Sequence, residues 1–286
     1  MSSNVSDSSD TDSTSPPPQP ILTACQDEQV LSLDLEENDF LYRVRKKNRV
    51  VYVWVLGEGI IPPGYRTDSY RILLYLRRVP RWEEEWTTLT VRNGTHGLES
   101  TLEEFKPHGL NLAKLDISTA KFYNLSSLTK VSRIGDRLSC VRADDNNEIW
   151  VMKIARFKHE VRYLQQEVSI YSILSSAGFL LAPRFIGYVY EGTKDRTIGF
   201  LMEMISGYPP DIQDLEECRS SIRLLHAIGI LHGDINKYNF LINEKGAQIL
   251  DFEASVALET VDPTASQKEL DGLEAKLRDK SGVGRK

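Results

Sequence analysis

The chain has few of the features that mark secreted or membrane-spanning proteins. Its 286 residues include only three cysteines, which lie far apart and form no C-x-x-C pair, so we expect reduced thiols in an intracellular protein, in cytoplasm or nucleus. No basic-then-apolar segment of the kind that directs secretion stands at the N-terminus. The longest mostly apolar run, residues 50–62, is interrupted by Gly57, Glu58 and Gly59 and is too short to span a bilayer.

The chain also lacks an excess of positive charge and any internal repeat. Its formal net charge is -6, whereas a nucleic-acid-binding protein is usually basic. We therefore expect neither a nucleic acid nor a membrane as partner. The length is sufficient for one large domain or two small ones with a sizeable core.

The first 124 residues contain two different kinds of sequence. Residues 1–20 are Ser, Asp, Thr and Pro with almost no apolar side chain, which predicts a disordered tail. Residues 21–124 predict a β-rich or mixed subdomain, because the runs 50–56, 70–76 and 86–91 are rich in β-branched and aromatic residues typical of strands. The sequence does not indicate a function for this subdomain.

A cluster of basic residues stands out in that subdomain. The cluster consists of Arg43, Arg45, Lys46, Lys47 and Arg49. It could form a nucleic-acid surface, but its alternation with an apolar residue at position 44 favours the solvent-facing side of a strand.

From residue 128 the pattern of elements is clearer. Apolar periodicity and turn residues predict strands at 128–134, 138–142 and 149–155, a helix over 158–175, a hairpin of 184–191 with 197–205, and a helix from Asp211 to near Gly229. The sequence from Ser266 to Glu269 has the pattern of a capping box before a last amphipathic helix.

The most informative stretch runs from residue 231 to residue 253. Asp234 stands five residues before Asn239, and Asp251 follows an apolar run twelve residues later. Short strands at 240–242 and 249–250, joined by a turn, would bring Asn239 and Asp251 to the same end of a hairpin. A carboxylate for the proton of an attacking hydroxyl, with an amide and a second carboxylate for magnesium, is the set that phosphoryl transfer requires.

This stretch resembles the catalytic loop (H-x-D-x-x-x-x-N) and the metal-binding D-F-G segment of the protein-kinase-like superfamily. Residues 151–154 are similar to the V-A-I-K strand, which implies that Lys153 contacts the phosphates of ATP. Glu167, on the helix that follows, is then the partner of Lys153, and Glu160 is the competing candidate.

The resemblance implies an α+β, two-lobed protein-kinase-like fold with an N-lobe at 125–205 and a shortened C-lobe at 206–286, preceded by a β-rich N-terminal extension. The segment after 200 is similar to the hinge between kinase lobes, so the Glu203 carbonyl and the Ile205 amide would meet the adenine edge. Gly135 would be the one glycine left of the three in the phosphate-binding loop.

The departures from the kinase pattern indicate an atypical member. Gly233 replaces the arginine of H-R-D, Glu253 replaces the glycine of D-F-G, and no A-P-E follows. The H-G-D and D-F-E motifs are similar to those of choline kinases and aminoglycoside phosphotransferases, and RIO-like kinases also have a short second lobe. The run from residue 214 to 282 resembles a group of small uncharacterised fungal kinase-like proteins in which the short C-terminus is native.

The resemblance implies a site that binds ATP and Mg²⁺. Asp234 would be the catalytic base, with His232 ordering the loop and Lys237 either neutralising the γ-phosphate or lying on the surface. The expected metal ligands are Asn239, Asp251 and Glu253, and the expected nucleotide-binding residues are Lys153, Glu167, Gly135, Glu203 and Ile205.

Three functions are compatible with this sequence. The first is an ATP- and magnesium-dependent phosphotransferase that acts on an unknown hydroxyl acceptor, a protein or a small molecule. The second is a pseudokinase that acts as a binding module, which the glycine-poor loop favours. The third is a small-molecule kinase. An acid pair of the glycosidase type at Asp251 and Glu253 is less favoured than magnesium binding.

Overall fold

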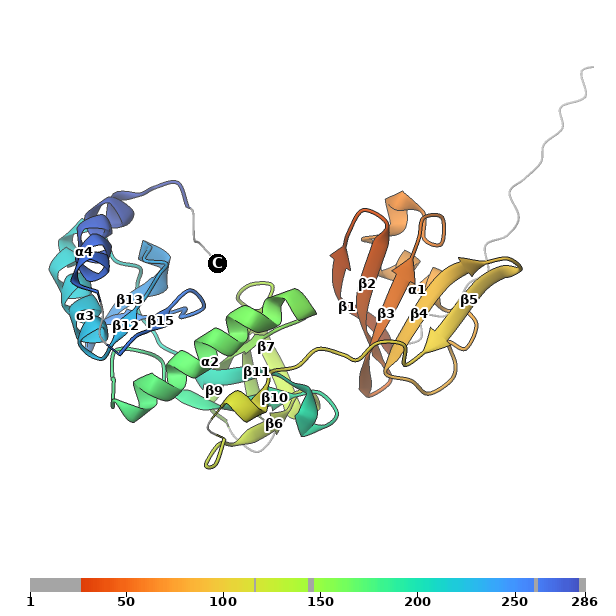
Figure 1. The fold of residues 1–286 in the computed structure, drawn as a ribbon, viewed down its shortest axis with the longest axis horizontal. Helices are drawn as coiled ribbons and strands as arrows, with labels where there is room; N and C mark the ends of the chain where they lie inside the picture. Colours follow the sequence, from red (N-terminus) through yellow and green to blue (C-terminus); the bar gives the residue numbers. More distant parts are fainter. Residues whose placement is uncertain (1–26, 116, 144–146, 260–261, 283–286) are drawn as a thin grey trace, which may run out of the picture.

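The structure is a computed structural model that describes residues 27–115, 117–143, 147–259 and 262–282. The predicted disordered tail, residues 1–20, lies outside the described residues. The fold is mixed α+β, and its parts follow one another along the long axis in Figure 1: a first sheet, a second sheet with helix α2, and a group of helices and short strands. None of the described helices is both long and apolar enough to cross a membrane.

The first sheet has five strands in the order β1-β2-β3-β4-β5. Its strands are β1 (Glu28–Leu35), β2 (Asp39–Lys46), β3 (Arg49–Leu56), β4 (Thr88–Gly94) and β5 (Gly97–Leu102). All neighbours are antiparallel except β3 and β4, and a parallel pair requires a long crossover. Residues 57–87 supply that crossover, and helix α1 (Ser69–Leu76) lies within it.

The strand predicted at 70–76 is wrong, because this segment is the helix α1. The Asp68 side chain accepts hydrogen bonds from the backbone N–H groups of Tyr70 and Arg71, which caps the helix. Ile72 and Leu76, one helical turn apart, are both fully buried. The apolar content had suggested a strand, but the cap and the four-residue spacing decide for a helix.

The second sheet has six strands in the order β6-β10-β11-β9-β8-β7. Its strands are β6 (Phe122–Asn124), β7 (Leu128–Arg133), β8 (Leu138–Ala143), β9 (Ile149–Ile154), β10 (Phe185–Tyr190) and β11 (Thr197–Glu203). Helix α2 (Val161–Ser176) packs on this sheet through the apolar side predicted from the sequence, with Leu164, Val168 and Tyr171 buried.

The C-terminal part combines two helices with the β13–β14 hairpin and a two-stranded sheet of β12 and β15. Its elements are α3 (Leu215–Ala227), β12 (Ile230–Leu231), β13 (Phe240–Asn243), β14 (Gly246–Ile249), β15 (Val256–Ala257) and α4 (Pro263–Arg278). One hydrophobic core joins α2, α3, α4 and the β13–β14 hairpin.

The capping box predicted at Ser266 is also wrong. Helix α4 begins one turn earlier, at Pro263, and the Asp262 side chain accepts from the Thr264 backbone N–H. The Ser266 hydroxyl instead bonds the ring of His226 on α3. Proline at the first helical position is favoured because its missing N–H would have no partner there.

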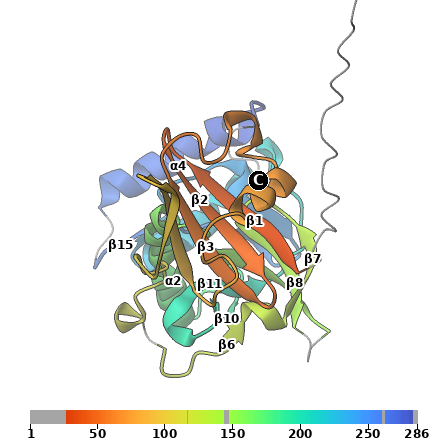
Figure 2. The same ribbon diagram turned by 90° about the vertical axis from the view of Figure 1, so that its right-hand side faces the viewer.

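The first sheet covers the outer face of the second one, with β1, β2 and β3 lying in front of β7 and β8 in Figure 2. Arg43 of β2 is buried and forms an ion pair with Glu191, which follows β10. The Tyr52 hydroxyl donates to the same carboxylate over 3.0 Å. The expectation that the whole basic cluster faces solvent is therefore wrong for Arg43, because an acid from the second sheet provides its partner.

We predict that Gly199→Ala destabilises the fold by about 1–3 kcal/mol, because the added methyl group overpacks the junction of β11 and β9. The new Cβ would lie 2.7 Å from Ile154 Cγ2 and closer still to the carbonyl oxygen of Lys153. Urea unfolding of both proteins measures the difference.

The matched control is Gly64→Ala, whose Cβ would meet nothing within 4 Å. Its stability should be unchanged or higher by up to about 1 kcal/mol, through the lower entropy of the unfolded chain. Equal effects of the two substitutions would contradict the packing at Gly199.

Candidate functional site

Lys153 is a buried lysine in the middle of the second sheet. It lies on β9 between Leu138 of β8 and Phe200 of β11, and only 3% of it is exposed. Because side chains alternate across a strand, the apolar side chains of Met152 and Ile154 face the opposite side. The ammonium group is therefore held inside the protein, where it needs anionic partners.

Three carboxylates surround that ammonium group. Lys153 Nζ lies 2.6 Å from Glu167 Oε2, 2.7 Å from Asp251 Oδ1 and 3.0 Å from Glu253 Oε1. Burial alone lowers the pKa of Lys153, but the three carboxylates outweigh it, so the pKa is raised. The lysine stays charged at any physiological pH.

Glu167 is the acid that α2 contributes to this cluster, as the sequence predicted. It is fully buried, and Oε1 also accepts from the Phe252 backbone N–H over 3.3 Å. Burial raises its pKa, and the Lys153 charge opposes that rise. The alternative candidate, Glu160, binds the guanidinium and backbone N–H of Arg156 instead.

Asp251 and Glu253 stand just after the β13–β14 hairpin. Asp251 has a φ of 63°, in the left-handed region that non-glycine residues seldom adopt and that is frequent at functional sites. Between them, Phe252 is fully buried against Tyr171 and His232, which turns both acids to the same side.

The acidic cluster has the composition of a cation site. One carboxylate oxygen from each of Glu167, Asp251 and Glu253 lies within 4.8 Å of the others. The sequence had predicted Asn239, Asp251 and Glu253 as metal ligands, so two of the three fall in this cluster. Asn239 lies next to it, because its carbonyl oxygen accepts from the backbone N–H of Leu250.

His232, Asp234 and Asn239 form a connected loop. The buried His232 ring donates from Nε2 to the carbonyl oxygen of Leu250 over 3.0 Å and accepts at Nδ1 from the Asp234 N–H over 3.3 Å. Asn239 Nδ2 donates to both the backbone oxygen and the carboxylate of Asp234, over 2.9 and 3.2 Å. This last bond fixes the direction of the Asp234 side chain.

The C-terminal helix holds the same loop in place. Glu269 of α4 accepts from the backbone N–H groups of His232 and Gly233, over 3.2 and 2.6 Å, and from His226 Nε2 over 2.8 Å. Burial raises the pKa of Glu269, but these bonds outweigh it, so the pKa is lowered. Gly233 has a φ of 80° and would clash with Ala254 if it carried a Cβ. The sequence pattern had placed Glu269 in a capping box and had not predicted its bonds to this loop.

Arg137 is a second site residue that sequence reasoning missed. It is the residue immediately before β8 and two residues after Gly135. Its Nη1 atom lies 2.9 Å from Glu253 Oε1. The predicted nucleotide-binding Gly135 lies in the preceding turn, where a Cβ would meet nothing within 4 Å. The kinase motif at this position consists of glycines, so it does not predict an arginine that contacts Glu253.

The remaining predicted residues lie away from Lys153. Lys237 has its ammonium over the Tyr238 ring, 5.3 Å from the ring centre. Glu203 and Ile205, at and after the end of β11, line a cavity of about 340 Å³ together with Asn243 and Gln248. Lys153 and the acidic cluster do not line that cavity.

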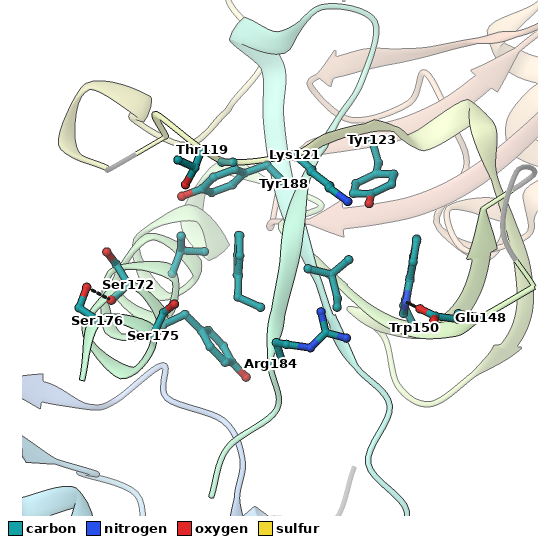
Figure 3. A pocket seen from close by; sticks show the side chains of 15 residues that line it. Thr119, Lys121, Tyr123, Glu148, Trp150, Ser172, Ser175, Ser176, Arg184 and Tyr188 are labelled. Carbon is teal, nitrogen blue, oxygen red and sulfur yellow. Dashed lines mark hydrogen bonds between the residues drawn. The ribbon is translucent and has the colours of Figure 1, made fainter. Parts of the chain in front are cut away.

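A polar cavity of about 830 Å³ lies elsewhere, between α2, β6 and β10. Figure 3 shows Ser172, Ser175 and Ser176 on one side of it and Trp150 with Glu148 on the other. None of the residues predicted for the site lines it.

A scan against models of known protein families gives no match for this chain, and a search of curated proteins finds no similar sequence. The case for a function therefore rests on the geometry of the site and the motifs.

We predict that folding stability falls as pH decreases below 6.5 because His232 is buried in its neutral form. Burial lowers the pKa of His232 below its ordinary value of 6.5. The unfolded chain takes up a proton below that value and the folded protein does not, so stability is lost by up to about 1.4 kcal/mol per pH unit. Urea unfolding at about pH 7.5 and 5.5 measures the loss.

Replacing His232 by Asn should make the stability less dependent on pH, whatever its effect on absolute stability. The exposed His96→Asn serves as control and should retain the wild-type pH dependence. Parallel stability profiles for wild type and His232→Asn would contradict the neutral buried ring.

We predict that Glu269→Ala destabilises the protein by about 2–4 kcal/mol, since it leaves two backbone N–H groups and a histidine without their acceptor. The control is Glu274→Ala on the same helix, which breaks only an exposed ion pair with Arg278 and should cost about 0.5 kcal/mol or less. Thermal and urea unfolding measure both. Equal costs would show that Glu269 does not hold the loop.

Proposed function

We propose that this chain is an ATP- and Mg²⁺-dependent phosphotransferase of the atypical protein-kinase-like type, with lobes at 125–205 and 206–286. The observation that supports it best is the buried cluster of Lys153 with Glu167 and Asp251, contributed by a strand, a helix and a loop that are distant in the sequence. Kinases use a lysine, a helical glutamate and a metal-binding aspartate in this relation.

The residues present fit a magnesium ion. Mg²⁺ prefers hard oxygen ligands, and Asp251 and Glu253 offer carboxylate oxygens within 4.8 Å of each other. Both hydrogen bonds from the Asn239 side chain to Asp234 use Nδ2. The amide oxygen Oδ1 is therefore the Asn239 atom that could bind the cation. When bound, Mg-ATP supplies the phosphoryl group and the ion neutralises its oxygens.

The chain's own residues then have distinct tasks. Lys153, fixed by Glu167, offers a permanent positive charge to phosphate oxygens. Asp234, oriented by Asn239, accepts the proton of the attacking hydroxyl, and His232 keeps the loop in shape without taking part in proton transfer. We assign Asp234 as base because Asn239 and Asn236 both donate to its Oδ2, which orients the carboxylate, and because it belongs to an exposed residue that an acceptor can reach.

The acceptor is a protein or a small molecule. The H-G-D and D-F-E motifs at Asp234 and Asp251 resemble those of small-molecule kinases as well as protein kinases. Choline-like amino alcohols and aminoglycosides should therefore be screened together with casein-like proteins.

A binding module without activity is the second candidate, and one observation favours it. Arg137 pairs with Glu253, so Arg137 and Lys153 together already neutralise part of the acidic cluster. In this alternative the two cations replace the metal ion and nucleotide is not turned over.

Phosphate release from Mg-ATP separates the two candidates. We predict measurable release by the wild type and a loss of about 10²–10⁴-fold in Asp234→Ala, since the proton acceptor is removed. Mg-ATP should still raise the melting temperature of Asp234→Ala, because this residue does not hold the nucleotide.

The control for that experiment is Asp271→Asn on the exposed side of α4, which should keep wild-type activity. If millimolar Mg-ATP shifts the melting temperature of none of these proteins, the proposed phosphotransferase activity is contradicted. A shift in wild type without phosphate release or transfer would favour the binding module.

A further inference from the structure

A cavity of about 690 Å³ lies between the first and the second sheet. One wall comes from β1 to β3 and the other from β7 to β9, including Ser139, Val141, Met152 and Ile154. Met152 and Ile154 flank Lys153 on β9, so by strand alternation the cavity is on the sheet face opposite to Lys153. Lys153 and the acidic cluster therefore do not line it, and Arg137, which pairs with Glu253, is the residue that the cavity shares with the candidate catalytic site.

The lining of this cavity is strongly basic. Seven basic side chains line it and only two acidic ones, Asp136 and Glu191, although the whole chain has a net charge of -6. The basic residues are Arg43, Arg45, Arg49, Lys130, Arg137, Arg156 and Arg196. From the negative net charge of the chain, one would expect a surface with more acidic than basic side chains, and this cavity has the reverse.

Five of the seven cations already have carboxylate partners: Arg43 and Arg196 pair with Glu191, Arg156 with Asp136 and Glu160, Arg137 with Glu160 and Glu253, and Arg49 with Glu85. Glu191 is buried and already receives Arg43, Arg196 and the hydroxyl of Tyr52. Lys130 and Arg45, on opposite walls, form no ion pair with any carboxylate in the described part of the chain.

Three guanidinium nitrogens at the cavity have no hydrogen-bond acceptor. They are Arg43 Nε, Arg137 Nη2 and Arg196 Nε, all fully buried. The Arg43 side chain is only 4% exposed, so bulk water does not replace the missing acceptor. A buried donor without acceptor costs about 1–3 kcal/mol, and such groups are rare unless a ligand or ordered water completes them.

We propose that this cavity binds a small anion with two or more phosphate groups. Guanidinium groups match phosphate geometry by paired hydrogen bonds, and several cations on two walls suit several phosphates rather than one carboxylate. The volume is in the range of about 300–1,000 Å³ that is usual for small-molecule sites.

The ligand would contact both sheets at once. It would therefore stabilise the attachment of the first sheet to the second, in addition to the Arg43–Glu191 pair. This site gives the N-terminal sheet a function that its sequence did not indicate, and it does not depend on the proposed phosphotransferase activity.

Isothermal titration calorimetry with sodium tripolyphosphate, in buffer without divalent cations, tests the proposal. The variant is Arg45→Gln/Lys130→Gln, which removes one exposed cation from each wall and leaves the buried Arg43 in place. We expect saturable binding to the wild type and at least about tenfold weaker binding to the variant, since two charge-assisted contacts to phosphate oxygens are lost.

Two further proteins sharpen this test. Arg45→Lys/Lys130→Arg keeps both charges and should bind within about threefold of the wild type, because these exposed side chains contribute their charge while the buried arginines provide the paired hydrogen bonds. Arg223→Gln/Lys268→Gln removes the same charge from exposed positions on α3 and α4 and should bind like the wild type.

No binding of tripolyphosphate at millimolar concentration would overturn the proposal. Equal affinity in the wild type and in Arg45→Gln/Lys130→Gln would also overturn it, because the anion would then bind elsewhere, for example at Lys153. Equal losses of affinity in Arg45→Gln/Lys130→Gln and in the Arg223→Gln/Lys268→Gln control would show that the anion responds to net charge alone, which contradicts specific binding in the cavity.

Discussion

The ammonium group of Lys153, held in the protein interior by three carboxylates, is the interaction on which the rest of the site depends. A buried charge must be paired, and here the partners come from α2 and from the loop after β14. The pairing therefore fixes the position of a helix and a loop relative to the sheet. Removing one partner of a buried pair typically costs about 3–5 kcal/mol, so this cluster links site geometry to stability.

Other parts of the site are held in a similar way, by polar side chains that form hydrogen bonds with a loop. Glu269 ties the loop before Asp234 to α4, and Asn239 directs the Asp234 carboxylate. Phe252, between Asp251 and Glu253 in the sequence, is fully buried in the hydrophobic core. The last helix is thus part of the support of the site, although it contributes no side chain to the acidic cluster.

Much of the second sheet could be predicted from the sequence because local pattern and tertiary packing agree there. The strand containing Lys153, the helix containing Glu167 and the hairpin before Asp251 all follow apolar periodicity. The segment 70–76 was misread because its two tyrosines and Ile72 favour a strand, while its three leucines suit a helix and the helix depends on the Asp68 cap.

The residues that sequence reasoning missed all depend on partners distant in the chain. Arg43 was expected in solvent and is buried because Glu191 reaches it from the other sheet. Arg137 and Glu269 meet their partners across 116 and 36 residues, a separation that no local pattern encodes. The kinase motifs indicated that Glu167, Asp251 and Glu253 belong to one site. They did not indicate that Arg137 pairs with Glu253 or that Glu269 binds the backbone of the loop.

The most direct test of the account is the effect of Mg²⁺ on the affinity for a non-hydrolysable ATP analogue, measured by calorimetry in the wild type and in Asp251→Asn. If the acidic cluster at Lys153 is a metal–nucleotide site, Mg²⁺ strengthens binding to the wild type by about tenfold or more, and this gain is lost in the variant. Absence of binding, or the same gain from Mg²⁺ in both proteins, would contradict it.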